Sequence, residues 1–213
     1  KLDRDMRARA GEVKVLARLG PLLAQDDAGA VRAVIEELQR AIPAYAFIGV
    51  ADASGKGKAS AGGLLEGGSI AARPVFQEGA KGLFLGDVHE AVMLAKLIPN
   101  PSGEPVKFVD VSAPILNADG SLAGVLATHL SWAWAREVQQ SVLSPLEGRH
   151  DVGLFVVSRG DSVLLGGDGL MGETLALDAV ARARKGRSAW TVERWPDGLE
   201  YLTGPPLPPG RAP

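Results

Sequence analysis

The chain has 213 residues, a formal net charge of -2 and no cysteine. This length is sufficient for one large domain or two small ones, each with its own hydrophobic core. Hydrophobic residues make up 46% and charged residues 23%, which is typical of a globular protein. Basic and acidic residues are interleaved without a lysine- or arginine-rich stripe, so we expect no nucleic-acid partner. The lack of cysteine excludes disulfides, thiolate metal sites and cysteine nucleophiles.

The first 43 residues predict a pair of amphipathic helices. Apolar residues recur at spacings of three and four over residues 2–19. A second helix is expected to begin near Asp26 and Asp27, which supply a cap and N-terminal negative charge, and to end before Pro43. We interpret residues 1–43 as an N-terminal helical stalk.

Residues 44–145 predict a first α+β module. Its clearest feature is a hairpin, in which the turn Asn117–Gly120 joins two long apolar strands. A helix that carries Trp134 and Val138 follows and ends before Pro145. The other expected elements, in chain order, are a strand at 44–51, a helix from Pro74 to about 81, a strand at 83–88, a short helix within 90–98, and the hairpin strands 105–116 and 121–131.

Residues 146–213 predict a smaller second module. The expected elements are strands at 152–158 and 162–165, a helix at 175–185, and a hairpin of 188–195 with 199–203. This order of strand, turn, strand, helix and hairpin repeats the first module, which indicates two related units. No clear final strand follows Thr203, so we expect the second module to be incomplete. The predicted fold class is α+β, a long N-terminal helix followed by two modules with antiparallel sheets.

Four segments carry a resemblance to a known family: 86–97 (GDVHEAVMLAKL), 104–114 (EPVKFVDVSAP), 124–132 (GVLATHLSW) and 194–204 (RWPDGLEYLTG). They resemble the double Cache sensors, which are PAS-like domains found outside the membrane in bacterial receptors. The resemblance implies a membrane-distal module at 44–145 that holds the ligand pocket and a membrane-proximal module at 146–213.

The resemblance implies a function as well as a fold. The chain would be a periplasmic, small-molecule sensing domain of a membrane-anchored receptor, without catalytic activity of its own. The variant motifs look most like sensors that precede diguanylate cyclases. A histidine kinase sensor, a chemoreceptor sensor and a stand-alone periplasmic solute-binding protein are the alternatives. Such receptors imply a homodimer, formed here through the first helix.

Two candidate ligand contacts lie at Arg73 and Phe76. In the amino-acid-binding members of the family an arginine, a tryptophan and another aromatic residue line the pocket. Arg73 and Phe76 match this pattern, whereas Val75 replaces the tryptophan. A guanidinium grips a carboxylate with two parallel donors. The alternative is that Arg73 binds no ligand and is a solvated residue in front of a helix.

The other candidate contacts are Asp87, His89, Asp110 and His129. Two residues apart on a strand, Asp87 and His89 would face one side, although a capped strand end explains them as well. His129 occupies a strand position where the family's amino-acid binders carry an aspartate, but it could also be a core histidine. Asp110 lies mid-strand and must be paired or face a polar cavity. It would form a salt bridge with Arg73 in the empty state, or else close the pocket.

In the family's amino-acid binders, aspartates at the positions of His89 and His129 hold the ligand ammonium. Their replacement by histidine, with the arginine kept, favours a small carboxylate ligand without an amino group. Two imidazoles and a carboxylate also suit zinc or iron, but no motif of fixed spacing supports a metal site. A hydrolase that uses His89 and Asp87 would need Ser112 or Ser131 as its nucleophile, and neither serine lies in an activating motif. We therefore expect no catalytic residue, no cofactor and no bound metal.

Overall fold

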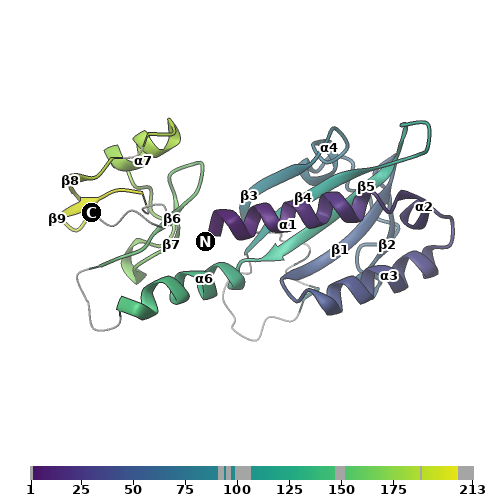
Figure 1. The fold of residues 1–213 in the computed structure, drawn as a ribbon, viewed down its shortest axis with the longest axis horizontal. Helices are drawn as coiled ribbons and strands as arrows, with labels where there is room; N and C mark the ends of the chain where they lie inside the picture. Colours follow the sequence, from purple (N-terminus) through teal and green to yellow (C-terminus); the bar gives the residue numbers. More distant parts are fainter. Residues whose placement is uncertain are drawn as a thin grey trace. The chain divides into compact units, whose positions relative to one another are not determined.

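The computed structural model describes residues 2–90, 94, 97–98, 107–146, 152–187 and 189–205. The chain divides into two compact units, Lys1–Ser144 and Pro145–Pro213 (Figure 1). Among the helices of these described ranges, none has both the length and the apolar character that a membrane crossing requires.

A five-stranded antiparallel sheet forms the centre of the first unit (Figure 1). Its order, β2-β1-β5-β4-β3, places the first and last long strands side by side. The three central strands are buried along most of their length, because both faces of the sheet are covered. The strands are β1 (Tyr45–Asp52), β2 (Gly57–Ser60), β3 (Phe84–Glu90), β4 (Lys107–Leu116) and β5 (Leu122–Ser131).

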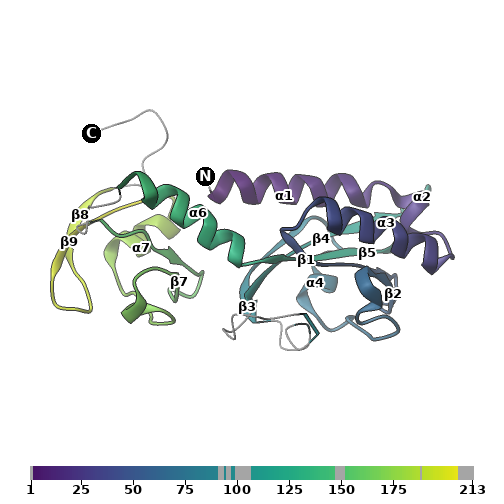
Figure 2. The same ribbon diagram turned by 90° about the horizontal axis from the view of Figure 1, so that it is seen from below.

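Helices α1 (Leu2–Ala17) and α3 (Ala28–Ala41) cover one face of this sheet, with the short α2 (Gly20–Leu23) between them (Figure 2). α1 packs against β4 and β5, and α3 packs against β1 and β2. The predicted cap of α3 is confirmed, since the Asp27 carboxylate accepts a hydrogen bond from the Ala30 amide at 3.0 Å. Both helices are therefore packed on the sheet within the first unit.

The other face of the sheet carries α4 (Pro74–Gln77) and the segment that leads to it (Figure 2). Pro74 begins this helix as predicted, because a proline at the first helical position loses no hydrogen bond. The helix is shorter than expected and ends at Gln77. The predicted hairpin is confirmed as β4 and β5, and α6 (Ala133–Leu143) follows it. The helix expected within 90–98 lies mostly outside the described residues.

The described residues of the second unit form two small hairpins and one α-helix. Its elements are β6 (Val156–Val157), β7 (Val163–Leu165), α7 (Asp178–Arg184), β8 (Thr191–Arg194) and β9 (Glu200–Thr203). The predicted order of elements is confirmed. In its described part, however, the strands form two separate two-stranded sheets, so the second sheet is less complete than expected. Its core is made by Val163, Leu175 and Leu177, with Phe155 and Trp195 packed against them.

Candidate functional site

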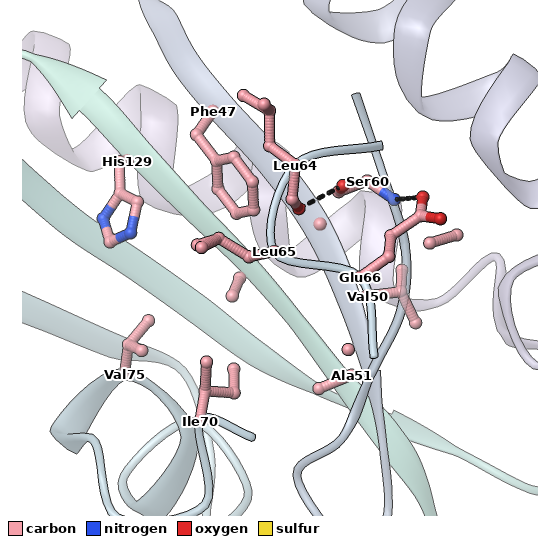
Figure 3. A pocket seen from close by; sticks show the side chains of 14 residues that line it. Phe47, Val50, Ala51, Ser60, Leu64, Leu65, Glu66, Ile70, Val75 and His129 are labelled. Atoms are coloured by element: carbon pink, nitrogen blue, oxygen red, sulfur yellow. Dashed lines mark hydrogen bonds between the residues drawn. The ribbon is translucent and has the colours of Figure 1, made fainter. Parts of the chain in front are cut away.

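A small cavity lies in the first unit between the sheet and the segment from Leu64 to Val75. Its volume is about 50 Å³, which is room for roughly three to five water molecules. Strands β1, β2 and β5 supply its floor, and the segment 64–75 supplies its cover (Figure 3). The lining residues are Phe47, Gly49, Val50, Ala51, Gly57, Ala59, Ser60, Leu64, Leu65, Glu66, Ile70, Val75, Ala127 and His129.

Small residues on neighbouring strands create this space. Gly49 of β1 pairs with Ala127 of β5, so the floor has little side-chain volume. The Phe47 ring leans over Gly49, and a Cβ atom at that glycine would lie 2.8 Å from the ring. The alternation of strand side chains thus places a large aromatic ring beside an open floor.

A partly buried ion pair between Arg32 and Glu66 holds the cover of the cavity in place. Arg32 of α3 donates from Nε to Glu66 Oε1 at 2.9 Å, and the Ser60 amide donates to the same oxygen at 2.9 Å. The hydrogen bond from Arg32 lowers the pKa of Glu66 below its usual range. The Ser60 hydroxyl also donates to the Leu64 carbonyl (Figure 3). These contacts hold Leu64 and Leu65 over the sheet.

One end of the cavity is polar. His129 lies there, and its cross-strand partner in the β4–β5 register is Asp110. His129 Nδ1 contacts Asp110 Oδ1, and His89 Nε2 lies 3.6 Å from the same oxygen. The side chains of Asp110 and His129 are only 10% and 12% exposed, whereas that of His89 is 42% exposed. Three adjacent strands therefore bring two imidazoles and one buried carboxylate together.

Aromatic rings enclose this polar cluster. The His129 ring lies 5.5 Å from the Phe47 ring and 5.8 Å from the Phe108 ring, measured between centroids. A buried carboxylate is tolerated only when it is paired or hydrogen-bonded, and the two imidazoles meet that need for Asp110. Of the three residues, His129 lines the cavity, so the arrangement presents one imidazole to it, and Asp110 and His89 lie behind that ring.

The structure separates Arg73 and Phe76 from this cluster. Arg73 is exposed at the N-cap of α4 and does not line the cavity. Phe76 is buried in a different apolar cluster, with Ala51 and Val125. Val75, which stands where the family resemblance would place a tryptophan, lines the cavity instead.

Asp87 also lies apart from the polar cluster. The β3–β4 register shifts between Leu85 and Val88, so strict alternation does not extend across this part of β3. The Asp87 side chain is exposed and accepts a hydrogen bond from the Val88 amide at 2.9 Å. Its main-chain carbonyl lies 3.3 Å from His89 Nδ1. Asp87 thus touches the cluster through its backbone.

Sequence reasoning missed the cover of the cavity. Leu64, Leu65 and Ile70 line it, yet no strand or helix pattern marks them. A usable signal was present, because residues 61–68 place two leucines among four glycines. Adjacent large apolar residues in a glycine-rich loop need a surface to pack against.

Comparisons with known proteins show the fold. No protein-family model and no curated protein matches the chain. The extracellular domain of the histidine kinase mmHK1S-Z2, described as putative, matches with a TM-score of 0.67 and 15% identity, over 95% of this chain and 85% of that one. The ligand-binding domain of the Pseudomonas aeruginosa PAO1 amino acid chemoreceptor PctC, in complex with GABA, matches with a TM-score of 0.64 and 22% identity, over 91% and 80%.

An extracellular ligand binding receptor from Desulfohalobium retbaense DSM5692 matches with a TM-score of 0.66 and 14% identity, over 89% of this chain. The chain spans about a third of that receptor, 33% of its length. All three likenesses concern the fold. The chain thus shares the α+β fold of a chemoreceptor ligand-binding domain and of a histidine kinase extracellular domain.

Proposed function

We propose that the chain is the extracytoplasmic ligand-sensing domain of a transmembrane receptor, and that its ligand binds in the cavity of the first unit. The observation that carries the proposal is an apolar cavity between sheet and cover with a polar cluster of His89, Asp110 and His129 at one end. Ligand sites typically combine an apolar concave wall with a few polar groups that fix orientation.

The proposed ligand is a small carboxylate. The His129 imidazole would donate to one of its oxygens, and the Phe47 ring and the Leu65 side chain would cover its apolar part. The volume of about 50 Å³ favours a molecule of a few heavy atoms. PctC was solved with GABA, which also carries a carboxylate. The side chains of Arg73, Phe76 and Asp87 do not line the cavity. A direct contact of these residues with the ligand therefore stays a prediction.

The proposed output is that of a chemoreceptor or a histidine kinase. Structures of both classes share the fold over most of this chain, and this favours them over a diguanylate cyclase. Ligand binding would act by favouring one of two arrangements of the sheet and its cover, since a ligand shifts an equilibrium only by its differential affinity.

A thermal-shift screen tests the proposal. The panel consists of C2–C6 mono- and dicarboxylates, GABA and the standard amino acids, in a buffer with EDTA and in one without it. A ligand that binds the folded chain raises its melting temperature by mass action. At a ligand concentration of a hundred times the Kd, the free energy of unfolding increases by about 2.7 kcal/mol. A specific acid that raises the melting temperature of the wild type, but not that of His129→Gln, supports the proposal. No shift with any member in either buffer contradicts it.

The Arg73→Ala variant tests the separate prediction of a carboxylate clamp. Loss of the acid-induced shift in this variant would place Arg73 in the bound site. An unchanged shift would remove that residue from it and leave the imidazole contacts as the anchor.

A further inference from the structure

We propose that His89, Asp110 and His129 bind a divalent transition-metal ion of the zinc class, and that the ligand carboxylate completes its coordination. The second half of this inference rests on the proposed function. The first half concerns these three side chains alone.

The donor set and its spacing fit such an ion. The three side chains each offer one ligand atom, and these atoms all lie within 4.8 Å of one another. In a tetrahedral site with bonds of about 2.0–2.1 Å, donor atoms lie roughly 3.3 Å apart. Small side-chain rotations would therefore be sufficient, chiefly of the exposed His89.

The chemistry of the donors selects the kind of ion. Two neutral imidazoles and one carboxylate carry a net charge of -1, which attracts a dication. Nitrogen donors favour zinc, nickel, cobalt or iron, whereas magnesium and calcium require mainly oxygen ligands. The chain has no cysteine, so thiolates do not compete for the ion.

The second nitrogen of His89 supports the assignment. His89 Nδ1 lies 3.3 Å from the Asp87 carbonyl, while Nε2 faces Asp110. A metal-binding histidine commonly donates its other ring N–H to a carbonyl, which fixes the tautomer and the orientation of the ring. The rings of Phe47 and Phe108 restrict His129 in the same way by packing. The site is thus oriented before any ion arrives.

The arrangement also leaves open positions. Three protein ligands with one free position are typical of zinc sites that bind a further small molecule. The 42% exposure of His89 gives access from solvent, and His129 lines the cavity on the other side. A carboxylate in the cavity would reach an ion held at this end.

Calorimetric titration of the chelator-stripped full chain with zinc chloride tests the metal half. We expect one ion per chain and no competition from millimolar magnesium. His89→Ala should weaken zinc binding at least about tenfold, because even outer partners of metal ligands contribute that much. Asp110→Asn should do the same. His150→Ala is the matched control, since His150 is the third histidine of the chain and is not one of the proposed ligands.

Circular dichroism of each variant establishes that it is folded, and His89 is exposed enough for its replacement to leave the core intact. Absence of zinc binding at a 100-fold molar excess of zinc over a micromolar concentration of the chain overturns the inference. So does zinc affinity that is unchanged in His89→Ala.

The second half is tested with the organic acid that shifts the melting temperature most. Its affinity should rise at least tenfold when zinc replaces EDTA. If the affinity for the organic acid is the same in zinc and in EDTA, the ligand carboxylate does not coordinate the ion. An acid that binds in EDTA to a chain that takes up no zinc would refute the metal site and leave the proposed function standing. If neither zinc nor any organic acid binds, both the metal site and the proposed function are refuted.

Discussion

Replacement of Ala127 by valine fills the proposed cavity from its floor. Ala127 is buried on β5 and lies opposite Gly49, where the floor has the least side-chain volume. The two added carbon atoms point toward Leu65 and the other cover residues. A ligand and the valine side chain would therefore compete for the same space.

The magnitudes can be worked from the cavity. Burial of two methyl-sized groups contributes about 1.6 kcal/mol, at about 0.8 kcal/mol for each. A cavity of about 50 Å³ accepts them with little strain, whereas overpacking in a filled core costs about 1–3 kcal/mol. We expect the free energy of unfolding to rise by no more than about 1.6 kcal/mol, because any overpacking would subtract from that gain. Ligand affinity should fall at least tenfold, which corresponds to about 1.4 kcal/mol.

Urea denaturation gives the stability of Ala127→Val, and calorimetry with the best organic acid gives its affinity. Ala113→Val is the matched control, because Ala113 is equally buried but does not line the cavity. The control should alter stability without altering affinity. Wild-type affinity in Ala127→Val would refute the assignment of the ligand to this cavity.

Three further outcomes follow from the described contacts. Glu66→Gln should destabilise the fold at pH 7, because Arg32 lowers the pKa of the Glu66 carboxyl in the folded state. The destabilisation should become smaller as pH falls below the unfolded pKa of a glutamate, and urea melts at a series of pH values measure it. Tyr45→Phe should cost about 1.5–3 kcal/mol at pH 7 through loss of the hydrogen bond to Glu12. This deficit should shrink above pH 10, because burial raises the pKa of Tyr45 and the wild type loses stability as pH rises through that range; alkaline denaturation measures it. Ser112→Ala should cost about 1–3 kcal/mol by leaving a buried carbonyl of α4 without its hydroxyl donor, and thermal melts that match the wild type would contradict this.

Local signals in the sequence predicted much of the first unit. The β4–β5 hairpin was predicted because Asn117–Gly120 marks a turn between long apolar strands, and Gly120 indeed has a φ of +83°. The start of α3 was predicted from the Asp27 cap. Strand β2 was missed, because Gly57–Ser60 contains no residue of high strand propensity and lies at the edge of the sheet.

The site could be predicted only as separate residues. His89, Asp110 and His129 were each candidates, but the pairing of Asp110 with His129 depends on the β4–β5 register, and Arg73 was expected as the partner of Asp110. The register shift after Leu85 is equally invisible in a single sequence. Long-range pairing decides both features, whereas capping and turn signals are local.

In the second unit, the order of elements was predicted but their separation into two sheets was not. Strands of two to four residues carry too few alternating positions to specify which sheet they join. In the described part of this unit, the core around Leu175 and Trp195 packs against two separate short hairpins.

Nitrogen-15 spectra of the histidine rings test the central claim most directly, because the chain has only three histidines. We predict that saturation with the best organic acid shifts the ring resonances of His129 and His89, while those of His150 stay in place. Ring resonances of His129 that remain unchanged at full saturation would contradict a ligand site in the cavity of the first unit.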